Sequence, residues 1–197
     1  MINEETVRDA KAALDALTYT LLSATEEANE GIEAPLRIKQ EEAVEMLCAD
    51  LEDMCYYVMG ADREISAAEE DMFDTLFGEF GMKARRTETS RREIKELSSV
   101  IKNGMPRTLA LFCEAAGNLG GKNGVPSEKT DEMFTEVFTC YIKLMCHVVA
   151  ADGEVKKREV GALCDYIEGL CSEASAQTGL RIDFKQEYVD LAVSLLS

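Results

Sequence analysis

Two carboxylate-rich segments of the chain share one spacing. Residues 62–69 read D-R-E-I-S-A-A-E, and residues 152–159 read D-G-E-V-K-K-R-E. Hard divalent cations such as Ca²⁺ and Mg²⁺ prefer oxygen ligands, and a bound ion relieves the repulsion between neighbouring carboxylates. The spacing therefore makes six residues candidate cation ligands, which are Asp62, Glu64, Glu69, Asp152, Glu154 and Glu159.

An EF-hand is the first interpretation of this pattern, because the later half of each segment resembles the end of a calcium loop. In that alignment the first and third ligand positions fall on Val58 and Gly60 in one segment. They fall on Val148 and Ala150 in the other. None of these side chains can supply a carboxylate oxygen, so a full calcium loop is excluded.

A purely structural corner is the second interpretation. In S66-A-A-E69 the serine hydroxyl and the Glu69 carboxylate can each accept a hydrogen bond from the other residue's backbone N–H, which is a capping box. Ile65 would then anchor the corner in the core, as Val155 would in the second segment, where Lys156 replaces the capping serine. The residues alone leave this interpretation and cation binding open.

Both segments belong to a longer repeat with an offset of ninety positions. Apolar residues of the preceding helix also correspond, since Leu47, Leu51, Met54 and Val58 align with Val137, Tyr141, Leu144 and Val148. This predicts two helix–acidic turn–helix units, near residues 39–80 and 129–170, related by a pseudo-two-fold axis. Each unit has one apolar face, so the two should pack together in a single domain spanning residues 1–197.

An all-α fold of about eight helices should position these corners. The chain has only three prolines and long stretches rich in Ala, Leu, Glu, Lys and Met. The helices are expected near residues 3–29, 37–59, 66–78, 90–102, 106–116, 127–151, 156–176 and 184–196. Capping-box sequences mark two further starts, at S90-R-R-E93 and D183-F-K-Q186.

The charge of the chain restricts its partners. A formal net charge of −17 disfavours nucleic acid and anionic membrane surfaces. One basic segment could instead bind an acidic protein partner, or simply form a solvated helix face, and its candidate contacts are Arg85, Arg86, Arg91 and Arg92. No apolar run is long enough for a transmembrane helix, and residues 1–11 lack a signal-peptide pattern, so we expect a cytoplasmic protein for which peripheral envelope association remains open.

The residues that could support catalysis lack a catalytic arrangement. Seven cysteines without a Cys-x-x-Cys pair are typical of reduced thiols packed as small hydrophobes. The single histidine, His147, is expected at the solvent edge of a helix, with no nucleophile arranged around it. The glycine-rich loop at 117–127 lacks the phosphate-binding motif. We therefore expect no enzymatic activity.

The two corners resemble those of a known family. V58-M-G-A-D62-R-E64-I-S-A-A-E69 and V148-V-A-A-D152-G-E154-V-K-K-R-E159 are similar to the acidic helix corner of the TerB-like tellurite-resistance family, which also occurs in the N-terminal domain of DjlA-type co-chaperones. The resemblance covers about thirty residues in each half. Arg63 departs from it by occupying the usual glycine position, so the first corner is the weaker cation candidate.

That resemblance implies a compact helical domain with an internal two-fold repeat and no known enzymatic activity. It also implies divalent-cation binding at the acidic corners, within a bacterial stress-response or envelope-associated system. The alternative is a protein-interaction scaffold whose acidic corners are purely structural and bind no metal.

Overall fold

The computed structural model describes residues 4–28, 40–62, 65–78, 106–119, 121–122 and 124–196. Seven α-helices lie within these ranges: α1 (Glu4–Ala28), α2 (Gln40–Met59), α3 (Ala67–Phe77), α5 (Arg107–Leu119), α6 (Glu128–Val149), α7 (Lys157–Thr178) and α8 (Gln186–Leu195). Short 3-10 turns, η1 (Gly60–Asp62) and η3 (Ala150–Asp152), follow α2 and α6. The all-α class predicted from the sequence is confirmed, while the helix expected at 90–102 lies outside the described residues.

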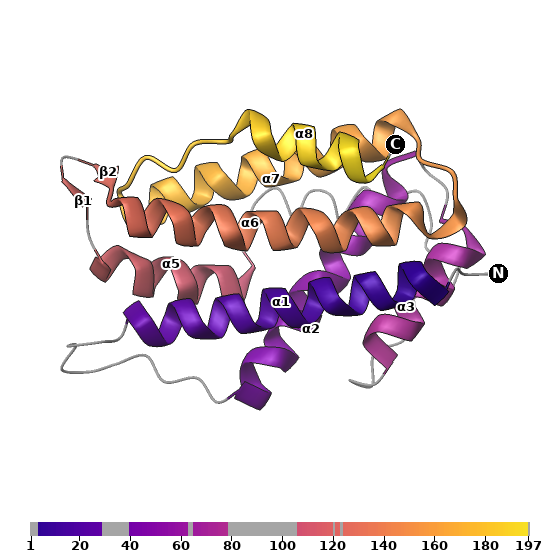
Figure 1. Cartoon of the computed structure of the whole chain (residues 1–197), viewed down its shortest axis with the longest axis horizontal. Coiled ribbons are helices and arrows are strands. Elements are labelled where there is room, and N and C mark those ends of the chain that lie inside the picture. Colours follow the sequence, from indigo (N-terminus) through magenta and orange to yellow (C-terminus); the bar gives the residue numbers. More distant parts are fainter. Residues whose placement is uncertain are drawn as a thin grey trace.

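Helix α6 runs through the middle of the molecule. Figure 1 shows α1 and α5 along one side of it and the α7–α8 pair along the other. Helices α1 and α6 are antiparallel, because Thr20 of α1 donates a hydrogen bond to Glu136 of α6 at 3.3 Å while Asp9 lies near His147. The pairing of α1 with α6 is the most extensive helix contact in the described part of the chain.

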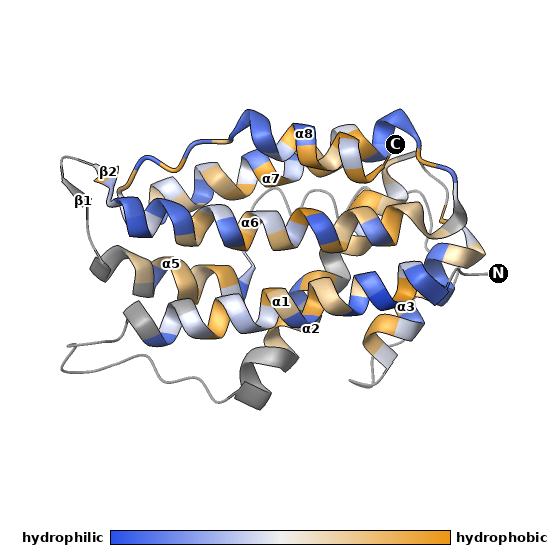
Figure 2. Cartoon of the chain, in the orientation of Figure 1, coloured by the Kyte–Doolittle hydropathy of each residue, from blue (hydrophilic) through white to orange (hydrophobic). Residues whose placement is uncertain are grey.

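The core is built around the apolar sequence of α6. Its buried side chains face several helices at once and include Phe134, Val137, Phe138, Tyr141, Leu144, Met145, Val148 and Val149. Ring contacts join Phe112 of α5 to Phe134 at 4.8 Å between centroids, and Phe138 to Tyr188 of α8 at 6.0 Å. Figure 2 shows hydrophobic residues along the inward sides of the helices, as burial of one apolar stripe requires.

Part of the glycine-rich loop forms a small ribbon. Strands β1 (Gly121–Lys122) and β2 (Val125–Pro126) pair antiparallel, which the sequence did not predict. Gly124 has a φ of 76°, a conformation that favours glycine, and its carbonyl accepts from the Arg181 N–H at 2.6 Å. This hydrogen bond joins the ribbon to the segment that connects α7 and α8.

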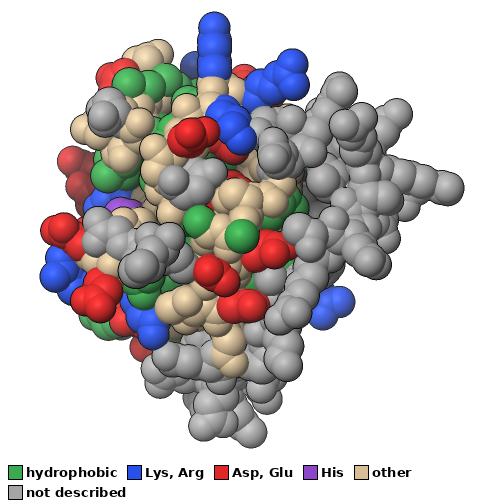
Figure 3. Space-filling model, turned by 90° about the vertical axis from the view of Figure 1, so that its right-hand side faces the viewer, with side chains coloured by type: hydrophobic (Ala, Val, Ile, Leu, Met, Phe, Trp, Pro, Cys, Tyr) green, Lys and Arg blue, Asp and Glu red, His purple; other side chains and the backbone are tan. Residues whose placement is uncertain are grey.

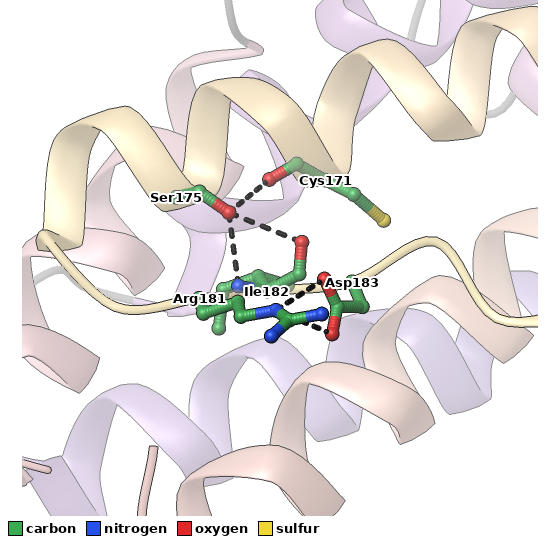
Figure 4. A network of polar contacts seen from close by, with 5 residues as sticks. All are labelled: Cys171, Ser175, Arg181, Ile182 and Asp183. Carbon is green, nitrogen blue, oxygen red and sulfur yellow. Dashed lines mark hydrogen bonds and ion pairs between the residues drawn. The ribbon is translucent and has the colours of Figure 1, made fainter. Parts of the chain in front are cut away.

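That connection corrects one predicted helix start. Figure 4 shows Ser175 Oγ accepting from the Ile182 N–H at 2.9 Å, and Arg181 Nε donating to Asp183 at 3.0 Å. Asp183 therefore pairs with Arg181 and does not cap α8, which begins at Gln186 after Lys185. The proposed start at D183-F-K-Q186 was wrong because this tertiary connection holds residues 181–185 outside the helix.

Candidate functional site

The first acidic corner joins α2 to α3 through η1. Glu69 N–H donates to Ser66 Oγ at 3.2 Å, and Ser66 N–H donates to Glu69 Oε2 at 2.6 Å. This reciprocal pair confirms the capping box predicted from S66-A-A-E69. Glu69 is only 2% exposed, so its carboxylate is a buried structural group at the start of α3.

The second corner, between α6 and α7, has one of the two hydrogen bonds of a capping box. Lys156 N–H donates to Glu159 Oε2 at 2.7 Å, and Glu159 is again only 2% exposed. The lysine side chain cannot accept a hydrogen bond, and the Glu159 N–H donates instead to the Lys156 carbonyl at 3.0 Å. Gly153, with a φ of 79°, supplies the left-handed residue that turns the chain before α7.

The remaining carboxylates of the two triplets are placed only in part. Glu154 is exposed. Glu64 and the side chains of Asp62 and Asp152 lie outside what the structure describes. Among the described residues, no three His, Cys, Asp or Glu side chains are grouped to hold a metal ion. The structure therefore places Glu69 and Glu159 as buried caps and Glu154 at the surface, while the side chains of the other three candidates lie outside what it describes.

Each corner packs against the other unit. The turn η1 of the first corner contacts α7, and η3 of the second corner contacts α3. Ile65 and Val155 are both half-buried against the core, as the structural interpretation predicted. Both corners lie toward the right-hand end of Figure 1. Figure 3 faces that end and shows acidic and basic side chains interspersed on it.

The cysteines are packing groups, as the sequence indicated. Five of the six described cysteines are buried, and Cys164 is half-buried. Burial raises the pKa of Cys113, Cys146 and Cys171 to about 12. A thiol with such a pKa is almost wholly protonated near neutral pH and is a poor nucleophile.

His147 is more enclosed than a solvent-edge position implies. It is half-buried on α6 near Asp9 of α1. Desolvation lowers its pKa below the ordinary 6.5, and the nearby Asp9 carboxylate partly opposes this change. The sequence pattern identified the polar stripe of α6 but could not show how closely α1 covers it.

This burial predicts a pH-dependent stability. Because the pKa of folded His147 lies below 6.5, the unfolded chain binds more protons as the pH falls through 6.5 toward the folded value. Stability contributed by the neutral imidazole is therefore present above pH 6.5 and is lost below it. Urea unfolding should show a smaller decline between about pH 7.5 and 5.5 for His147→Gln than for wild type. Equal declines would contradict this linkage, since the chain has a single histidine.

A third carboxylate with a structural role, Asp50 of α2, was not predicted. Its Oδ1 accepts from the Arg107 N–H at 3.0 Å, and its Oδ2 accepts from the Thr108 N–H at 2.9 Å and from Thr108 Oγ1 at 2.7 Å. Asp50 thus caps α5 from another helix and sits at its positive end. Tyr141 is fully buried beside Thr108 and Asp50, and burial raises the pKa of its hydroxyl.

No family model, curated protein or solved structure matches this chain. The resemblance to TerB-like domains therefore rests on the residues of the two corners. The candidate partner contacts Arg85, Arg86, Arg91 and Arg92 lie outside the described residues. None of the described helices is both long and apolar enough to cross a membrane.

Proposed function

We propose that this chain is a non-catalytic helical protein-interaction module of the TerB-like type, with structural acidic corners. One observation supports the proposal: several of the described ionisable groups that could perform chemistry are engaged in building the fold. Glu69 and Glu159 cap helices, Asp50 caps α5, and the thiols of Cys113, Cys146 and Cys171 remain protonated near neutral pH. Lys185 Nζ similarly donates to Asp131 at 2.8 Å and joins α8 to α6.

The matched corners support an internal duplication within this module. Ser66 and Lys156 lie ninety positions apart, both have extended backbones, and both donate an N–H to the glutamate three residues later. A pseudo-two-fold relation between units near 39–80 and 129–170, within a single domain of residues 1–197, accounts for this match. It also accounts for the contacts of η1 with α7 and of η3 with α3.

The proposed partner is an acidic protein that contacts Arg85, Arg86, Arg91 and Arg92. The basic segment favours such a partner because the rest of the chain is strongly acidic. Participation in a bacterial stress-response or envelope-associated system is part of the proposal and rests on the TerB-like resemblance.

Divalent-cation binding is the second candidate function, and the reciprocal packing of the corners favours it. Each corner contacts the outgoing helix of the other unit, so the fold brings the two acidic segments toward one end of the molecule. Glu69 and Glu159 would then fix the backbone of the two corners by capping α3 and α7. Ca²⁺ or Mg²⁺ would be bound by the outer carboxylates, which are Asp62, Glu64, Asp152 and Glu154.

Thermal unfolding with and without divalent ion separates the two functions. An ion that binds only the folded state, at about 100 times its dissociation constant, adds about 2.7 kcal/mol to the free energy of unfolding. If the acidic corners are purely structural, Ca²⁺ and Mg²⁺ should stabilise the protein no more than NaCl does at matched ionic strength.

A matched pair of variants identifies the residues responsible for any excess stabilisation. Asp152→Asn with Glu154→Gln should remove an excess caused by the outer carboxylates while leaving the Glu159 cap intact. Exposed Asp190→Asn with Glu187→Gln on α8 makes the same charge change away from both corners. An excess lost only in the corner variant would establish the cation function in place of the purely structural corner.

A further inference from the structure

We draw no further inference here: the strongest candidate, the basic run of Lys156, Lys157 and Arg158 at the start of α7, is a helix N-terminus next to the acidic residues of the second corner, and nothing in the part of the chain that the structure describes shows what binds or covers it.

Discussion

Replacing Glu159 with alanine should lower the free energy of unfolding by about 2–3 kcal/mol. The substitution removes the acceptor of the Lys156 N–H at a site where the glutamate is 2% exposed. An orphaned buried donor costs about 1–3 kcal/mol, and loss of a favourable charge at a helix N-terminus adds about 0.3–1 kcal/mol. Urea denaturation of both proteins measures the difference.

Two further variants test whether the lost free energy of unfolding comes from the hydrogen bond that caps α7. Glu159→Gln keeps an oxygen that can accept the same N–H, so it should cost less than Glu159→Ala. Glu154→Ala changes an exposed carboxylate in the same corner and should stay within about 0.5 kcal/mol of wild type. Similar losses for Glu154→Ala and Glu159→Ala would contradict a specific capping role.

Replacing Asp50 with alanine is expected to cost about 3 kcal/mol. One carboxylate accepts two backbone N–H groups and a hydroxyl at the start of α5, so its removal leaves three donors without their acceptor. Hydrogen bonds to charged groups contribute about 1.5–3 kcal/mol, and loss of a helix cap costs about 0.5–2 kcal/mol. The hydrogen-bond and helix-cap contributions describe partly the same interactions. The expected total is therefore about 3 kcal/mol and not their sum. Urea unfolding at neutral pH provides the measurement.

The matched control for Asp50 is Asp165→Ala on α7. Asp165 is exposed in the middle of a helix, so its loss should change stability by no more than about 0.5 kcal/mol. Asp50→Asn retains one acceptor oxygen and should fall between the two alanine variants. A loss for Asp50→Ala no larger than for Asp165→Ala would show that water replaces the carboxylate at the start of α5.

Local sequence was enough to predict the helices that the structure describes, apart from the start of α8, and the capping box of the first corner. The apolar spacing of α6 and the S66-A-A-E69 box act within one or two helical turns, where backbone geometry fixes which groups can meet. Glu159 was also found this way, because it stands at the same offset as Glu69 even without a capping serine. These features need no knowledge of the tertiary structure.

Contacts between distant segments could not be predicted in the same way. Asp50 caps Thr108 from 58 positions away, and no residue near either one signals the pairing. The incorrect start of α8 has the same origin, since the ribbon and Ser175 hold the residues before it. The closeness of α1 to His147 likewise depends on packing between helices. The cation site and the basic partner surface remain predictions.

Each acidic corner packs against a helix from the other half of the chain. Each half therefore needs the other to complete the packing of its corner. Because η1 contacts α7 and η3 contacts α3, part of the packing surface of each corner comes from the other helix–turn–helix unit. On a ribosome adding about 5–20 residues per second, the first corner must wait several seconds for α7 to be synthesised. Until then its apolar surface is open to chaperones, and the final structure forms only after the second half has emerged.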